Sequence, residues 1–289
     1  MNELIDINSI KIWVETFGNK SGKPLILIAG AMAPSVFWNK DFCNELADDG
    51  FFVVRFDNRD IGFSTHFEPC RPNSISKIPY TVNDMVEDVV GILDYFNVRK
   101  SVIVGHSFGC TIAQLFAVKY PQRTEKLFLL ASPIIAKGKN QYIETDEHTK
   151  RQLWDVLIAN KMYQDYERGK GEFFRVWRYL NGTYELDERM AEEYTKRIYE
   201  TEHIEPAWNH TKVQENIRDI YNELNVLPIK IHFIYGEADY LAANLASIKI
   251  LVYSLENADL EILSGAGHLF FSSTLWTKIL QIFEKKFLK

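Results

Sequence analysis

A serine between two glycines is the first residue of this chain that could act as a nucleophile. The pentapeptide GHSFG, centred on Ser107, follows the apolar run 101–105 and opens a helix-like segment at 107–120. A serine in a tight strand-to-helix turn takes a strained backbone conformation, and glycines on both sides remove Cβ atoms that would separate strand from helix. The pattern predicts Ser107 as a catalytic nucleophile, with helix capping as the simpler alternative.

Attack by Ser107 on a carbonyl group would create an oxyanion that needs backbone hydrogen-bond donors. The same turn would present the N–H of Phe108 at the positive end of the helix dipole, which suits an oxyanion. A second donor should come from the GAM segment that follows the apolar run 25–29. We expect the N–H of Ala31 to supply it, with the N–H of Met32 as the alternative.

A serine nucleophile also needs a base and a carboxylate that orients the base. Of the seven histidines, His268 alone lies just after a late strand-like run, in the glycine-flanked loop GAGHL. The carboxylate is expected in GEAD, directly after the run 229–236, where Asp239 is the first choice and Glu237 its neighbouring rival. The carboxyl ends of parallel strands meet at one sheet edge, so these side chains should converge on Ser107.

Short apolar runs alternate with segments of helical length along most of the chain. The runs are nearly continuous, as in strands covered on both faces, and lie at residues 25–29, 51–56, 101–105, 126–131, 229–236 and 260–265. Helix-like segments lie at residues 35–49, 81–97, 107–120, 241–257 and 273–287. The alternating segment 10–17 predicts an exposed antiparallel strand before them. We therefore expect an α/β fold with a mostly parallel, doubly wound sheet and an antiparallel N-terminal edge.

Residues 137–225 interrupt this alternation with polar and aromatic segments that contain no strand-like run. They predict a helical cap inserted into a core formed by residues 1–136 and 226–289. A cap that emerges at the carboxyl ends of the strands would cover the serine site, and an aromatic wall there would favour an apolar or aromatic ester. The residues expected to line the substrate pocket are Met32, Trp154, Phe174, Trp177 and Leu269.

Composition and charge exclude several classes of partner. The chain has 289 residues, of which 46% are hydrophobic and 25% charged, as in ordinary globular proteins. Its net charge of −6 argues against a nucleic-acid or anionic-membrane surface, which would require clustered Lys and Arg. Neither a signal-peptide pattern at the start nor a run of 18 apolar residues is present, so we expect a cytoplasmic protein. We expect it to be a monomer or a homodimer.

Several groups that could suggest other chemistry are expected to be structural. The three cysteines are widely spaced and outside any CxxC pattern, so we expect neither a disulfide framework nor a metal site. His106 should point away from Ser107 and support the turn. Asp57, Arg59 and Asp60 are expected to brace a loop through an ion pair rather than to bind metal or phosphate. We expect no cofactor.

Taken together, these motifs resemble the α/β-hydrolase superfamily over almost the whole chain. The resemblance rests on GHSFG, GEAD, GAGH and the block RFDNRDIGFST at residues 55–65, which is similar to a D-x-R-x-x-G-x-S segment of the family. It implies the hydrolase order of nucleophile, acid and base, here Ser107, Asp239 and His268. The serine separates the chain from the haloalkane-dehalogenase and epoxide-hydrolase branches, which use an aspartate there.

Within the superfamily, residues 27–38 and 55–64 look most like small bacterial esterases, including those similar to aclacinomycin methylesterases. One departure is Ala29, which stands where the family usually has the histidine of a His-Gly opening. The backbone donors of the oxyanion loop are unaffected, but the sequence identifies no side chain that supports this loop.

The function expected from these residues is hydrolysis of a small-molecule carboxylic ester by a cofactor-independent serine hydrolase. The same constellation also serves lyase chemistry and carbon-carbon bond hydrolysis in the superfamily. In its ligand-sensing and signalling branches, an intact triad supports binding with slow turnover. Both remain alternatives at this point.

Overall fold

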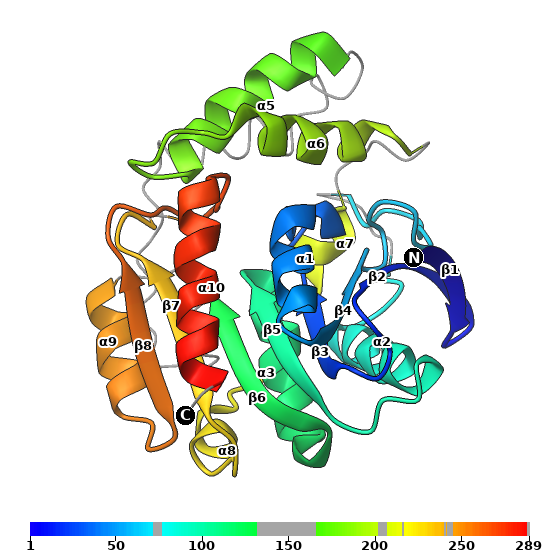
Figure 1. The fold of residues 1–289 in the computed structure, drawn as a ribbon. Helices are drawn as coiled ribbons and strands as arrows, with labels where there is room; N and C mark the ends of the chain where they lie inside the picture. Colours follow the sequence, from blue (N-terminus) through cyan, green and yellow to red (C-terminus); the bar gives the residue numbers. More distant parts are fainter. Residues whose placement is uncertain are drawn as a thin grey trace.

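A sheet at the centre of the molecule carries the loops that hold Ser107, Asp239 and His268 (Figure 1). The computed structural model describes residues 1–71, 77–131, 166–201, 207–215, 217–239, 241 and 245–287. Within these residues the sheet has eight strands in the order β1-β2-β4-β3-β5-β6-β7-β8. The strands are β1 (Asn2–Ile7), β2 (Ile10–Phe17), β3 (Lys23–Ile28), β4 (Phe51–Phe56), β5 (Ser101–His106), β6 (Thr124–Leu130), β7 (Ile231–Gly236) and β8 (Ala258–Leu263).

Strand directions confirm the predicted α/β fold. β2 pairs antiparallel with β1 and β4, and all other neighbours are parallel. β1 is an addition to the prediction, joined to β2 by a turn in which Asn8 and Ser9 have φ values of 48° and 63°. Turns of this kind usually carry glycine at the second position, so Asn-Ser is a weak sequence signal.

Helices cover both faces of the sheet. They are η1 (Ser35–Phe37), α1 (Lys40–Asp48), α2 (Val82–Tyr95), α3 (Phe108–Lys119), η2 (Pro121–Arg123), α5 (Tyr166–Leu180), α6 (Glu188–Tyr199), α7 (Trp208–Lys212), α8 (Tyr221–Asn225), α9 (Leu245–Tyr253) and α10 (Ser273–Phe287). The single helix predicted over 35–49 is divided, because Asn39 caps a new helix by accepting the N–H of Phe42.

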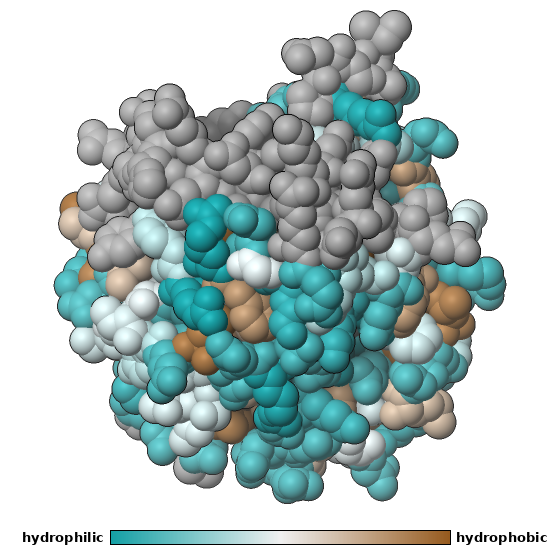
Figure 2. All heavy atoms as spheres, turned by 90° about the horizontal axis from the view of Figure 1, so that it is seen from above, coloured by the Kyte–Doolittle hydropathy of each residue, from teal (hydrophilic) through white to brown (hydrophobic). Residues whose placement is uncertain are grey.

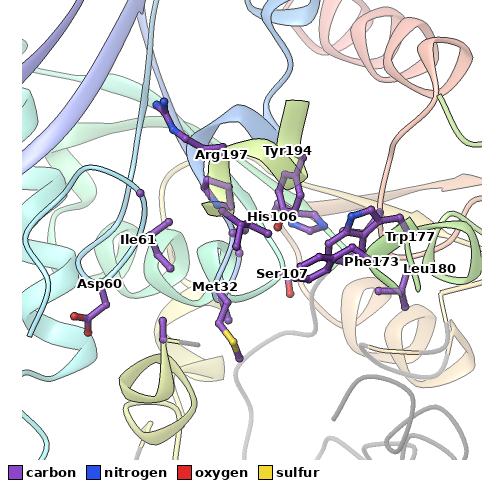
Figure 3. Close-up of a pocket in the computed structure, with 18 of the residues that line it drawn as sticks. Met32, Asp60, Ile61, His106, Ser107, Phe173, Trp177, Leu180, Tyr194 and Arg197 are labelled. Carbon is purple, nitrogen blue, oxygen red and sulfur yellow. The ribbon is translucent and has the colours of Figure 1, made fainter. Parts of the chain in front are cut away.

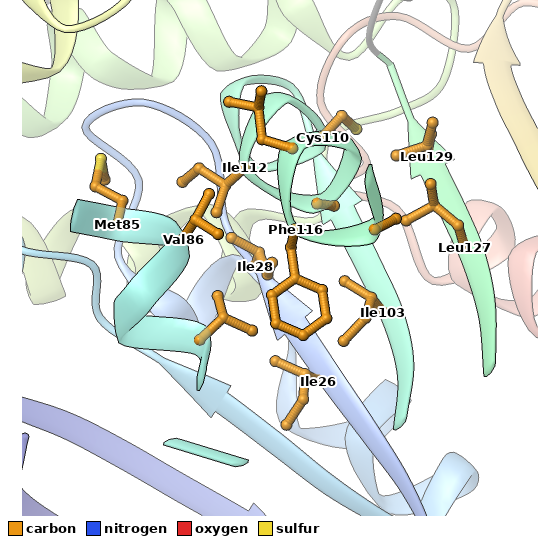
Figure 4. Close-up of a cluster of buried hydrophobic side chains, with 14 of the residues drawn as sticks. Ile26, Ile28, Met85, Val86, Ile103, Cys110, Ile112, Phe116, Leu127 and Leu129 are labelled. Atoms are coloured by element: carbon orange, nitrogen blue, oxygen red, sulfur yellow. The ribbon is translucent and has the colours of Figure 1, made fainter. Parts of the chain in front are cut away.

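Alternate side chains of each central strand enter different hydrophobic cores. On one face, Phe116 of α3 packs among Ile26, Ile28 and Ile103 (Figure 4). On the other face, Leu25 and its alternate neighbours pack with α1 and α10. Burial on both faces explains why these strands are nearly continuous apolar runs in the sequence.

Helices α5 and α6 lie beyond the carboxyl ends of the strands (Figure 1). Their inward sides are apolar, with Phe173, Trp177 and Tyr194 buried. Seen from above, the described surface is mainly hydrophilic, with small hydrophobic groups scattered across it (Figure 2). Among the described residues, no helix has both the length and the apolar character needed to cross a membrane.

The start of α3 approaches β3 and β5 so closely that glycine is required at two positions. A Cβ atom on Gly109 would lie 2.3 Å from the carbonyl oxygen of Ile28. A Cβ atom on Gly105 would lie 2.6 Å from the backbone nitrogen of Cys110. Because the obstructing atoms are backbone, no side-chain movement could relieve these contacts. This is the close approach that the two glycines of GHSFG predicted.

Replacing Gly109 by alanine should therefore lower the free energy of unfolding by about 2 kcal/mol or more, the scale of severe overpacking. Gly171 is a matched control, because it lies in α5 and a Cβ there would meet nothing within 4 Å. Gly171→Ala should raise stability by about 0.5 to 1 kcal/mol. Urea unfolding followed by tryptophan fluorescence measures both. Equal stability of Gly109→Ala and wild type would contradict the packing argument.

Candidate active site

Ser107 occupies the turn between β5 and α3 in a conformation that few residues adopt. Its φ is 51° and its ψ is −122°, which for a residue with a Cβ atom is strained. The N–H of Ser107 donates to the carbonyl oxygen of Leu130 on β6 at 2.9 Å, which secures the turn against the neighbouring strand. The side chain remains partly exposed and borders a cavity.

Three side chains at the carboxyl edge of the sheet form a hydrogen-bonded chain. Ser107 Oγ lies 3.0 Å from His268 Nε2, and His268 Nδ1 lies 2.9 Å from Asp239 Oδ2. The other carboxylate oxygen of Asp239 accepts the N–H of Leu241 at 2.9 Å. The structure thus brings together the three residues that the motifs selected. The arrangement fits an imidazole that donates from Nδ1 and accepts the serine proton at Nε2.

Glu237, the rival carboxylate, has different partners. It accepts hydrogen bonds from the hydroxyl of Ser264 at 2.7 Å and from the N–H of Gly265 at 3.1 Å. These two donors, the Ser264 hydroxyl first, hold the pKa of Glu237 below its ordinary value. Glu237 is therefore placed to brace the turn that begins the His268 loop.

His106, the last residue of β5, supports the His268 loop from the side of the sheet. Its Nε2–H donates to the backbone carbonyl of His268 at 2.9 Å, and its ring stacks on Phe37 with centroids 4.0 Å apart. Complete burial, with a contribution from the nearby His268, holds the pKa of His106 well below its ordinary value, so the ring is neutral. His106, which was expected to support the serine turn, thus directly contacts the backbone of His268.

The segment after α5 holds the same loop from the other side. The N–H of Leu269 donates to the carbonyl of Leu180 at 3.0 Å, and the N–H of Thr183 donates to the carbonyl of Gly265 at 2.8 Å. A Cβ on Gly267 would lie 2.2 Å from the Leu180 carbonyl oxygen, so this contact requires glycine. The loop that carries the histidine is therefore clamped between the sheet and the α5–α6 connection.

Two backbone N–H groups in the segments next to Ser107 have no hydrogen-bond acceptor among the described residues. They are the N–H groups of Phe108 and Ala31. The N–H of Met32, in contrast, donates to Nδ1 of His210 at 3.1 Å. A Cβ built on Gly30 would lie 3.1 Å from the Cβ of Ser107, so this loop runs directly over the serine. The geometry favours Ala31 over Met32 as the second donor.

A cavity of about 240 Å³ opens beside Ser107 and His268 (Figure 3). Met32, Trp177 and Leu269 line it, as expected from the sequence. Trp154 lies outside the described residues. The cavity is bordered largely by apolar and aromatic side chains. The lining residues that the sequence reasoning missed include Ile61, Phe173, Leu180, Tyr194, Arg197 and Ile198.

The prediction for Phe174 was wrong, and its neighbour Phe173 lines the cavity instead. Phe173, Trp177 and Leu180 are spaced at i, i+4 and i+7 and therefore share one face of α5. Phe174 is rotated by about 100° from that face. Its ring packs below the charged end of Lys170, 5.5 Å from the ring centroid. The helical spacing was present in the sequence and would have selected Phe173.

Arg197 brings a positive charge to the cavity wall, but this charge is compensated. Its guanidinium lies over the ring of Phe63, 4.1 Å from the centroid, and Nη2 is 3.8 Å from Asp57 Oδ2. Figure 3 shows the guanidinium turned away from Ser107. The cavity is therefore suited to apolar rather than anionic groups.

The acidic and basic residues after β4 brace loops, as predicted, but Arg59 pairs outside its own loop. Its guanidinium binds both carboxylate oxygens of Asp88 on α2, at 2.5 and 2.7 Å. Asp57 accepts the N–H of Ser35 at 2.7 Å, and Asp60 accepts the hydroxyl of Tyr80 at 2.5 Å. Within the described part of the chain, no group of three or more His, Cys, Asp or Glu residues could hold a metal ion.

Comparison with known proteins identifies relatives of this arrangement. Residues 23–273 match a family model described as the alpha/beta hydrolase fold. Rhodomycin D methylesterases of Streptomyces sp. (strain C5) and Streptomyces peucetius are 34% and 33% identical over 120 residues, 42% of this chain. The matched region spans only 38% of the length of each relative.

A solved structure extends the similarity over the whole chain. 2-Hydroxy-6-oxo-6-phenylhexa-2,4-dienoate hydrolase from Rhodococcus sp. strain RHA1 superposes with a TM-score of 0.73 and 19% identity, covering 100% of both chains. At this identity, the similarity concerns the fold.

The neutral state of His106 should make stability depend on pH. Because the folded pKa is lowered, acidification below about pH 6.5 protonates His106 in the unfolded chain first and removes stability as the pH falls. At pH 7.5, His106→Gln should have a lower free energy of unfolding than wild type. On acidification, its free energy of unfolding should fall less steeply than that of wild type, by up to about 1.4 kcal/mol per pH unit. Urea unfolding at pH 7.5, 6.5 and 5.5 measures this slope. An unchanged slope in the variant would contradict the neutral assignment.

Proposed function

The chain belongs to the α/β-hydrolase fold family, and from this premise we propose that it is a serine hydrolase of small-molecule carboxylic esters. One observation carries the proposal: Ser107 Oγ, His268 and Asp239 form a continuous hydrogen-bonded chain with separations of 3.0 and 2.9 Å. A serine becomes a nucleophile at neutral pH when such a base can take its proton. The similarity to rhodomycin D methylesterases supports ester cleavage over other uses of the fold.

In the proposed reaction, Ser107 Oγ attacks the ester carbonyl while His268 Nε2 takes the hydroxyl proton. Asp239 fixes the imidazole tautomer and stabilises the imidazolium that forms. The N–H groups of Phe108 and Ala31 stabilise the oxyanion of the tetrahedral intermediate. His268 then returns the proton to the leaving alcohol, which leaves an acyl-enzyme on Ser107. Water attacks this ester by the same steps, releases the acid and restores the serine.

The cavity supports a preference for small or medium apolar and aromatic esters. Its volume of about 240 Å³ lies just below the range of 300–1,000 Å³ that is usual for drug-sized ligands. Phe173, Trp177 and Tyr194 supply flat apolar surface, and the charge of Arg197 is directed elsewhere. An uncharged acyl or alkoxy group of modest size would bury most of its surface here.

We further propose that residues 137–225 form a helical cap on a core built from residues 1–136 and 226–289. The described part of this insertion supports the assignment, because α5 and α6 lie beyond the carboxyl ends of the strands (Figure 1). Phe173 and Trp177 from α5 and Tyr194 from α6 contribute to the cavity wall. Substrate selection would then depend chiefly on residues of the cap.

Hydrolysis of p-nitrophenyl butyrate tests the roles of the three residues. Ser107→Ala should show no turnover above background, and Asp239→Asn should lower kcat by about 10⁴-fold through the wrong imidazole tautomer. Glu237→Gln is the matched control and should stay within about threefold of wild type, because Glu237 binds Ser264 rather than His268. A large loss in Glu237→Gln with little loss in Asp239→Asn would transfer the acid's role to Glu237.

Cavity shape can be tested with p-nitrophenyl esters of increasing chain length. Trp177→Ala should raise the octanoate-to-acetate ratio of kcat/KM about tenfold, because removal of the indole ring enlarges the apolar cavity by several methylene volumes. Phe174 precedes Trp177 by three residues in the same helix and does not line the cavity. Phe174→Ala should therefore leave this ratio within about twofold. A larger change in the Phe174 variant would contradict the assignment of the α5 face.

A further inference from the structure

We infer that His210 is the residue that positions the oxyanion-binding loop, through the backbone N–H of Met32. The inference rests on the proposed function, because it concerns the same oxyanion site. His210 lies on the short helix α7 and its side chain has no measurable exposure, at 0%. It is 178 residues away from Met32 in the sequence. Within the described residues, no hydrogen bond or ring contact joins His210 to Ser107 or His268, so its role would be indirect.

Both ring nitrogens of His210 are engaged with backbone. Nδ1 accepts the N–H of Met32 at 3.1 Å, and Nε2 lies 2.8 Å from the carbonyl oxygen of Arg59, to which its proton is donated. This assignment requires a neutral ring. Burial holds the pKa of His210 below its ordinary value; the hydrogen bond to the Arg59 carbonyl and the charge of Asp60 oppose this lowering, and the nearby His66 adds to it.

The hydrogen bond acts where the oxyanion loop is least able to hold its own shape. Met32 has a φ of 56°, a left-handed conformation that is unfavourable for a residue with a side chain. It directly follows Ala31, whose N–H is the proposed second donor. The His210 ring also packs against the ring of Phe108 at a centroid distance of 5.7 Å. One side chain therefore contacts the segments that carry both donors.

The position of His210 is secured by contacts that do not involve its own ring. Its neighbour Asn209 donates to Asp60 Oδ2 at 2.9 Å and accepts the N–H of Cys70 at 2.9 Å. Helix α7 thus has an independent anchor, so replacement of the ring should release the oxyanion loop without releasing the helix.

The first test compares variants of His210 in the hydrolysis of p-nitrophenyl butyrate. His210→Leu removes the acceptor at similar size and should lower kcat by about 10- to 100-fold with KM within about threefold, because only the transition state carries the oxyanion. His210→Asn keeps an oxygen near the position of Nδ1 and should recover most of kcat. His210→Gln extends its amide towards Arg59 and should not. His232→Gln is the control and should retain wild-type kcat, because His232 lies at the amino end of β7, whereas the site lies at the carboxyl edge of the sheet.

A second test separates loop positioning from a general loss of structure. An alkyl trifluoromethyl ketone forms a tetrahedral oxyanion adduct with an active serine, whereas the matching methyl ketone binds as a ground-state mimic. His210→Leu should weaken inhibition by the trifluoromethyl ketone about 10-fold or more and leave the methyl ketone within about twofold. A folded His210→Leu with wild-type kcat and wild-type inhibition would overturn the inference.

The outcomes also separate this inference from the proposed function. If the wild-type protein is inactive on the ester and is not inhibited, the proposed function fails. If wild type is active and the His210 variants match it, only the positioning role fails. If circular dichroism shows that His210→Leu does not fold, the Asn and Gln variants decide, and equal kcat in these two would overturn the positioning role.

Discussion

The left-handed backbone of Ser107 is the constraint on which the rest of the site depends. It allows β5 to turn directly into α3, and the turn is possible only because Gly105 and Gly109 let helix and strand backbones approach within contact distance. The strained turn directs Oγ towards His268 at 3.0 Å and leaves the N–H of Phe108 at the start of the helix without an acceptor among the described residues. A more relaxed connection would separate Ser107 from both His268 and this N–H group.

The surrounding contacts keep the loops at the sheet edge in register with that turn. The His268 loop is held by His106 from the sheet side and by the carbonyl of Leu180 from the α5 side. The loop after β3, which carries the proposed oxyanion donor Ala31, is held by the N–H of Met32, which donates to His210. His106 and His210 are both buried, and burial lowers the pKa of each ring, so both rings are neutral. A charged ring at either position would place an unpaired charge in the interior, which is costly.

How much the sequence could predict depends on the range of the interaction. Strands buried on both faces leave continuous apolar runs, and the short spacings around Ser107, Asp239 and His268 lie within single loops, so both could be recognised locally. Phe173 could have been selected in place of Phe174 from helical spacing alone. His210 could not, because its contact with the oxyanion loop joins segments 178 residues apart and depends on how α7 packs. The ion pair of Arg59 with Asp88 on α2, 29 residues away, is equally a product of tertiary packing.

The central claim is that Ser107 is an activated nucleophile, and covalent labelling tests it most directly. Wild type and Ser107→Ala would be exposed to a fluorophosphonate between pH 5 and 9 and examined by intact-mass measurement and peptide mapping. We predict one adduct per wild-type chain, located on Ser107, and no adduct on Ser107→Ala, because only an activated serine is a nucleophile towards the reagent. A folded wild-type protein that remains unlabelled, or an equal adduct on Ser107→Ala, would contradict this claim.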